Sequence, residues 1–192
     1  MPMIDVTIPE GALKPEAEER LMRELTDILI AHEGFDVGNK VAQGVTVVFL
    51  HRPAAVYVAG QRSPTPRYRI VPSVPEGQYT DAARKSLVKA VTEAVARADG
   101  RKYEDVAPLV WVFPTEVPDG QWGSRGVIRP LRDIQAFIAG AEERTVGEQR
   151  LARRRRQKAL ALLEGALDAA RKGVDTDAAR EAGATPPQAD WS

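Results

Sequence analysis

The sequence predicts an α/β fold of the α+β kind, in which two fused β-α-β units form a four-stranded sheet with two helices on one face. Short β-branched runs alternate with amphipathic segments, this order returns once after 66 residues, and the carboxy-terminal part lacks it. Neither unit can bury its sheet face alone, so two units side by side are expected. The predicted boundaries are 1–61 for the first unit, 62–138 for the second and 139–192 for a helical tail.

The first unit begins with residues 3–8, whose alternation of apolar and polar residues predicts a strand. Pro15 suits the first turn of the helix that follows, and Gly34 is placed to end that helix. The β-branched run 44–50 predicts a second strand, parallel to the first and covered on both faces. Residues 53–60 then predict a turn and a short extended segment.

The second unit repeats these features after a proline-rich connector. The Pro-Glu-Gly turn that ends at Gly11 returns in the turn that ends at Gly77, and Gly34 returns as Gly100. Strands are predicted at 68–74 and 109–113, with a helix between them. The apolar residues expected on one face of that helix are Leu87, Val88, Val91, Ala94, Val95 and Ala98.

The tail has a different composition. Residues 141–172 are rich in Ala, Glu, Leu and Arg and predict one or two exposed helices, whereas 176–192 have little to bury and are expected to be poorly ordered. The four arginines at 153–156 span slightly more than one helical turn, so their side chains point in all directions around the helix. Two interpretations are retained: a solvated helix surface, and contact with an anionic partner.

The amino-acid composition excludes or disfavours several kinds of catalytic site and partner. The chain has no cysteine and two histidines, which excludes thiolate sites and leaves zinc chemistry and a serine triad poorly supplied. Acidic and basic residues balance at 27 each, so net charge gives no argument for nucleic acid as a partner. No signal peptide or membrane span is predicted, and a cytoplasmic location without membrane contact is expected.

Pro2 directly after Met1, the short strand, the Glu-Gly turn and the Gly-flanked aromatic hairpin after the second strand together resemble the tautomerase superfamily. The likeness covers about residues 2–138 in two fused copies. Segments 53–60 and 61–69 bring the chain nearest to the cis-3-chloroacrylic acid dehalogenase branch. The resemblance implies a homotrimer and isomerase-type activity.

It also implies a role for Pro2. If Met1 is removed, Pro2 carries a free secondary amine, which an apolar pocket keeps neutral near pH 7. Such an amine takes a proton alpha to a carbonyl group and returns it elsewhere, without metal or cofactor. A small 2-oxo acid or its enol is the expected substrate.

The chain departs from the family at several positions. The arginine that follows the Glu-Gly turn in 4-oxalocrotonate tautomerase is replaced by Ala12 and Gln78. Two of the groups that the dehalogenase branch uses, a glutamate and a helix histidine, fall at about Gln121 and at Leu29. Dehalogenase or hydratase activity is therefore not expected.

Other residues must then bind the substrate. Arg69, Arg125 and Arg129 are the candidate carboxylate ligands, although solvated surface charges remain an alternative for each. The remaining candidates for the pocket are Phe113, Gln78 and Trp122, of which Trp122 equally suits a subunit contact.

The missing family arginines and the long tail leave a second function open. In that case the chain is a non-catalytic trimeric scaffold or binding module that recruits a partner through its basic carboxy-terminal helix.

Overall fold

The computed structural model describes residues 2–181, with side chains up to residue 173. The chain divides after Leu151 into two compact units. The first unit holds the sheet, the helices that cover it and the beginning of the last helix. The second continues that helix from Ala152.

One sheet organises the first unit. Its strands lie in the order β2 (Val47–His51), β1 (Met3–Thr7), β5 (Tyr68–Pro75) and β6 (Val110–Val112), and β7 (Thr115–Val117) pairs with β5 beyond β6. The β1–β2 and β5–β6 pairs are parallel. Strands β1 and β5 run antiparallel, and their pairing joins the first β-α-β unit to the second. The predicted α+β architecture with two fused β-α-β units is therefore confirmed.

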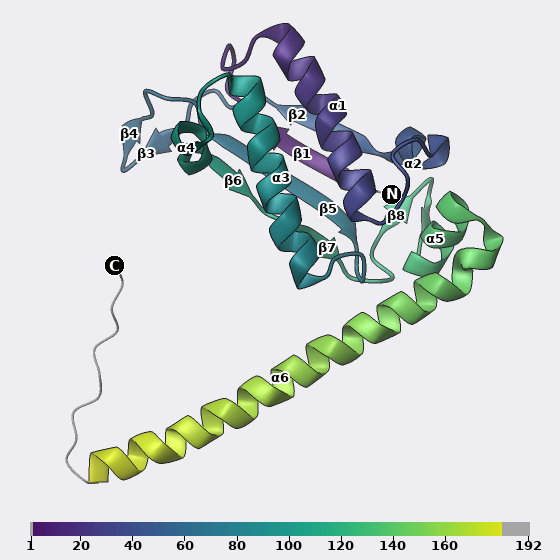
Figure 1. Ribbon diagram of the computed structural model, residues 1–192, viewed down its shortest axis with the longest axis vertical. Helices are drawn as coiled ribbons and strands as arrows, with labels where there is room; N and C mark the ends of the chain where they lie inside the picture. Colours follow the sequence, from purple (N-terminus) through teal and green to yellow (C-terminus); the bar gives the residue numbers. More distant parts are fainter. Residues whose placement is uncertain (1, 182–192) are drawn as a thin grey trace. The chain divides into compact units, whose positions relative to one another are not determined.

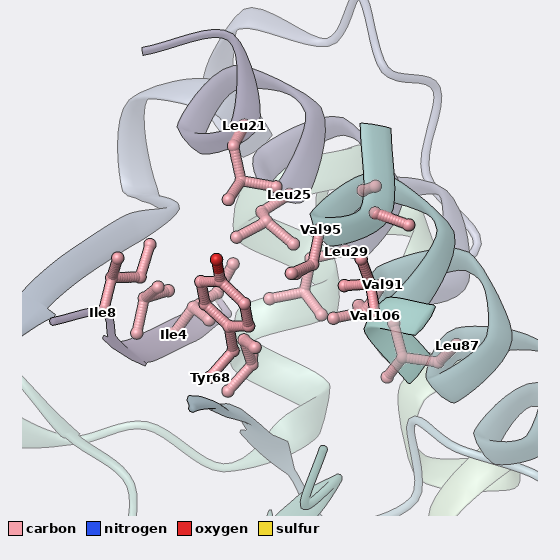
Figure 2. Close-up of a cluster of buried hydrophobic side chains, with 14 of the residues drawn as sticks. Ile4, Ile8, Leu21, Leu25, Leu29, Tyr68, Leu87, Val91, Val95 and Val106 are labelled. Atoms are coloured by element: carbon pink, nitrogen blue, oxygen red, sulfur yellow. The ribbon is translucent and has the colours of Figure 1, made fainter. Parts of the chain in front are cut away.

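Helices α1 (Pro15–His32) and α3 (Asp81–Asp99) lie next to each other over one face of the sheet (Figure 1). Pro15 occupies the first turn of α1, and the Thr80 side chain caps α3 by accepting a hydrogen bond from the Ala83 amide at 3.0 Å. The helices and strands share one core, part of which Figure 2 shows. Of the helix face predicted for the second unit, Val88 is the exception, because its side chain is 36% exposed.

The repeat is visible in the backbone. Helix α3 begins 66 residues after α1, and the corresponding turn glycines Gly11 and Gly77 have φ values of 70° and 97°. Only glycine adopts this conformation readily, which explains why both Glu-Gly turns carry it.

The strand predicted at 44–50 differs in position and environment. Residues Lys40–Val45 form a short helix, α2, capped by Asn39, whose side chain accepts hydrogen bonds from two amides of the first turn. Strand β2 therefore begins only at Val47. It is an edge strand whose Phe49 and Leu50 side chains are exposed, so the predicted burial on both faces is wrong for the single chain.

Several short elements complete this unit. Two hairpins confirm the extended segments after β2 and β7. They comprise β3 (Tyr57–Val58), β4 (Gln61–Arg62), β8 (Gly123–Ser124) and β9 (Val127–Ile128). The short helical elements are α4 (Tyr103–Val106), η1 (Ala107–Leu109), α5 (Leu131–Ala139) and η2 (Ala141–Glu143).

The predicted tail helix is present as α6 (Arg144–Glu181). Residues 176–181, expected to be poorly ordered, belong to this helix, and the rest of that segment lies outside the described residues. No helix in the described part of the chain has the length and apolar character to cross a membrane.

Candidate active site

Pro2 lies at the amino end of β1 and is buried. Its carbonyl oxygen accepts a hydrogen bond from the Val47 amide at 3.3 Å, which fixes the residue against the start of β2. Because Met3 pairs with Ser73 in the antiparallel ladder, Pro2 lies near the carboxyl end of β5 and the turn that follows it. This end of the sheet is the candidate active site.

Glu33 caps the carboxyl end of α1 and is 2% exposed. Burial raises the pKa of Glu33 to about 7, whereas the positive charges of the amino terminus and Arg150 act in the opposite direction. The Glu33 carboxyl group is thus buried and titrates near neutral pH. The sequence analysis does not identify Glu33 as a site residue. Its position was an available signal, because an acidic residue is unfavourable at the carboxyl end of a helix dipole.

Arg150, in the second turn of α6, joins this region. Its Nη1 atom donates to Oε1 of Gln78 at 2.6 Å and to the backbone oxygen of Glu33 at 3.3 Å. Gln78 is buried in the turn after β5, so Arg150 bridges that turn to the end of α1. We call Glu33, Gln78, Tyr79 and Arg150 the buried polar cluster.

Tyr79 is the fourth member. Its hydroxyl group is buried and has no hydrogen-bond partner among the described residues, as is also true of Nε2 of Gln78. Burial, followed by the Glu33 and Glu116 charges, raises the pKa of Tyr79, and Arg84 opposes this rise. The cluster therefore holds a buried phenol that is neutral at neutral pH.

Trp122, another predicted site residue, lies between β7 and β8. It packs on a second apolar cluster that includes Ile30 of α1 and Val45, two residues before the amide that binds Pro2. Its carbonyl oxygen accepts a hydrogen bond from the Arg129 amide at 2.8 Å, which closes the β8–β9 hairpin.

Arg125 and Arg129 line a small pocket beside that hairpin. The Arg125 guanidinium group lies 5.5 Å from the centroid of the Phe137 ring, within the distance of a cation–π contact. Ile134 belongs both to this pocket and to the apolar cluster around Trp122, so the two arginines adjoin the Trp122 side of the candidate site.

Arg69 and Phe113 lie elsewhere. Arg69 pairs with Thr7, which is five residues beyond Pro2 along β1, or about 16 Å at 3.3 Å per residue. Its guanidinium group lies 5.7 Å from the Phe113 ring, in a groove of about 460 Å³ that Trp111 and Tyr57 also line. Within one chain, the structure does not bring these two residues to Pro2.

Comparison with known proteins identifies the fold. The chain matches no protein-family model and no curated protein. A member of the cis-3-chloroacrylic acid dehalogenase family named N1 has a TM-score of 0.56 at 18% identity, with 74% of this chain and 98% of that chain covered. A fused 4-OT protein whose structure is a symmetric trimer has a TM-score of 0.53 at 22% identity, covering 72% of this chain and 98% of its own.

Pt0534, crystallised after inactivation by 2-oxo-3-pentynoate, has a TM-score of 0.53 at 23% identity, with 66% of this chain and 94% of that chain covered. These neighbours are members of the tautomerase superfamily, and at such identities the likeness shows the fold. The superfamily fold predicted from the sequence is thus confirmed. The neighbours are covered almost completely, whereas a quarter or more of this chain has no counterpart in them.

Proposed function

We propose that the protein is a cofactor-independent enzyme of the tautomerase type, in which Pro2 acts as general acid and base once Met1 has been removed. The observation that carries this proposal is the burial of Pro2 at the amino end of β1, in a fold that its tautomerase-superfamily neighbours share. An α-amino group titrates near pH 8 in water, and burial disfavours its cationic form. A buried proline amine can therefore be neutral near pH 7 and accept a proton.

The proposed substrate is a small 2-oxo acid or its enol. Proton transfer between the carbon and oxygen ends of such a molecule needs a group that accepts a proton at one atom and returns it at another. Arg125 and Arg129, near Trp122, are the cations of the same chain proposed to hold the carboxylate. The 2-oxo acid that inactivated Pt0534 supports this substrate class by analogy only.

A homotrimer is proposed as the active form. The fused 4-OT neighbour assembles as a symmetric trimer, and the Arg69–Phe113 groove of this chain lies on the part of the sheet far from its own Pro2. In a trimer the groove of one subunit can lie against the Pro2 end of another, which gives Arg69, Phe113 and Gln78 roles in one composite site.

The Pro2→Ala substitution tests the mechanism. Mass spectrometry first establishes that Met1 is absent, and turnover of phenylenolpyruvate is then followed at pH 7. We expect a loss of at least about a hundredfold, because an amino-terminal alanine offers a primary amine of different basicity and geometry. Pro64→Ala, in the exposed connector, is the matched control and should keep full activity. Retained Met1, or an unchanged rate in Pro2→Ala, would contradict the proposal.

A second function is favoured by the carboxy-terminal unit, which lies outside the two β-α-β units. Between residues 152 and 173, α6 exposes Leu160, Leu162, Leu163 and Leu167 together with basic side chains. A non-catalytic scaffold that recruits a partner through this helix would show no enol turnover in the wild type. It would also lose its partner when residues 152–192 are deleted.

A further inference from the structure

The β8–β9 hairpin carries an arginine at a turn position that disfavours one. Ser124 pairs with Val127, so Arg125 and Gly126 form a two-residue turn, with φ values of 53° and 76°. Positive φ values at both positions are typical of a type I′ turn, whose first position favours Asn, Asp or Gly. In this conformation the Cβ atom of Arg125 crowds its own backbone, so the turn holds the residue in an unfavourable state.

The first unit contains the same turn without the arginine. In the β3–β4 hairpin, Val58 pairs with Gln61, and Ala59 and Gly60 lie between them with φ values of 50° and 77°. Ala59 occupies the position that corresponds to Arg125. The reason for an arginine at this position must therefore lie in its side chain, since the turn forms without one.

The side chain of Arg125 reaches helix α5. Its guanidinium group lies 5.5 Å from the centroid of the Phe137 ring, which is a cation–π distance. The ring is 47% exposed, so this contact holds the guanidinium group at the surface. Arg125 and Arg129 both line the small pocket beside the hairpin, which brings two cations to one place.

Neither of these two arginines forms an ion pair with an acidic side chain among residues 2–173. Asp133 also lines the pocket, but it forms ion pairs with Arg144 of α6 and, at 3.9 Å, with Arg132. The negative charge of Asp133 is thus compensated by other residues. The pocket keeps two positive charges that an anion from solution can neutralise.

The size of the pocket limits the anion. Its volume is about 30 Å³, and a water molecule needs about 10–15 Å³ on this measure. The two oxygen atoms of a carboxylate group therefore fit, and the paired N–H donors of arginine match their geometry. A whole 2-oxo acid does not fit, so the rest of such a ligand must lie outside the pocket.

We propose that Arg125 and Arg129 form a binding subsite for one carboxylate group, and that Phe137 positions Arg125 for it. The proposal deepens the proposed function, because it says where the carboxylate of a small 2-oxo acid binds and gives Phe137 a role. The subsite itself requires neither a free Pro2 amine nor a second subunit.

The test uses acetate as the ligand and acetamide, which has the same shape and no charge, as its control. NMR of the ¹⁵N-labelled full chain follows the Nε–H signals of the two arginines at pH 6, with NaCl keeping the ionic strength constant. Both signals should shift saturably with acetate and stay in place with acetamide. Arg129→Met should weaken acetate binding by about tenfold. Phe137→Leu should weaken it by about three- to fivefold, whereas Phe137→Tyr keeps an aromatic face and should bind like the wild type.

Arg125→Asn separates binding from stability. Asparagine suits the left-handed turn position, so this variant should unfold at a higher temperature and yet bind acetate about tenfold more weakly. Ala59→Asn, at the corresponding position of the first hairpin, should also unfold at a higher temperature and should keep the wild-type affinity. A loss of binding in Arg125→Asn therefore cannot come from misfolding.

Equal shifts with acetate and acetamide, or wild-type affinity in Arg125→Asn, would overturn the subsite. Wild-type affinity in Phe137→Leu would overturn the role of Phe137. Because the readout needs no turnover, a protein that binds acetate in this way but converts no enol would refute the proposed function and leave the subsite in place.

Discussion

Glu33 occupies a position that elementary electrostatics disfavours twice. A carboxylate at the carboxyl end of a helix faces the negative end of the helix dipole, and this one is also buried. An isolated buried charge costs several kcal/mol, so the Glu33 side chain must either keep its proton or be compensated. The Arg150 guanidinium group offsets part of this cost, but burial outweighs it and raises the pKa of Glu33 to about 7.

This environment predicts how stability depends on pH. In the folded state the pKa of Glu33 is about 7, above its unfolded value, so the folded protein binds more protons between about pH 4.3 and 7. The stabilising contribution of this group is complete below that range and is lost as the pH rises to 7. The unfolding free energy can fall by at most about 3 kcal/mol through this group, because one pKa unit corresponds to about 1.4 kcal/mol.

Urea unfolding at pH 4.5, 5.5 and 7 measures this effect. Since other carboxyl groups also titrate, the relevant quantity is the difference in unfolding free energy between Glu33→Gln and the wild type. It should shift in favour of the variant as the pH rises. Glu19→Gln, on the exposed side of α1, should show a constant difference. A constant difference for Glu33→Gln would mean that the pKa of Glu33 is the same in the folded and the unfolded protein.

The residues of the candidate site differ in how far the sequence can predict them. Pro2 and Gln78 stand at positions that the repeat and the family likeness mark. Arg150 contacts Glu33 across 117 residues, and no periodicity or spacing relates two such positions. The separation of Arg69 from Pro2 depends on the antiparallel pairing of β1 with β5. The sequence analysis predicts two units side by side but not the direction in which their adjoining strands run.

At the scale of elements, the repeated ones were predictable because their signals are local. Helices α1 and α3 carry long amphipathic patterns with proline or threonine at the start and glycine after the end. By contrast, α2 has six residues and depends on its Asn39 cap. Strand β2 contains the β-branched run of a buried strand, but its place at the sheet edge is set by tertiary topology.

Two of the glycines of α6, Gly147 and Gly165, allow its packed beginning to be compared with its exposed continuation. A Cβ atom on Gly147 would lie 2.8 Å from the Cα atom of Arg132, whereas one on Gly165 would meet nothing within 4 Å. Gly147→Ala should therefore destabilise the protein by about 1–3 kcal/mol through overpacking. Gly165→Ala should be neutral or stabilise the helix by up to about 1 kcal/mol.

Thermal unfolding followed by circular dichroism compares the two variants. Equal effects would show that the first turns of α6 do not pack on α5, and would remove the structural basis for placing Arg150 in the site. Because the two substitutions are chemically identical and lie in the same helix, differences in intrinsic helix propensity cancel between them.

For the whole molecule, the main question is what covers the sheet face opposite α1 and α3. Val48, Val110 and Val112 face the core, and strand alternation directs the residues between them to the other side. That side carries large apolar side chains that are about half exposed in the single chain. They are Val47 at 44%, Phe49 at 47%, Trp111 at 59% and Phe113 at 45%.

An apolar sheet face next to the open edge strand β2 is typical of a subunit interface. We therefore expect the wild type to have three times the 21.0 kDa chain mass in sedimentation equilibrium. Trp111→Asp places a charge at the centre of this face and should yield monomers, because an unpaired carboxylate is costly to bury. Leu162→Asp, at the most exposed leucine of α6, should leave the mass unchanged, as should deletion of residues 152–192.

If Trp111→Asp kept the wild-type mass, this face would not be the interface. If the deletion alone produced monomers, assembly would depend on the carboxy-terminal helix. That helix would then hold the subunits together, and the proposal that it recruits a partner would be wrong.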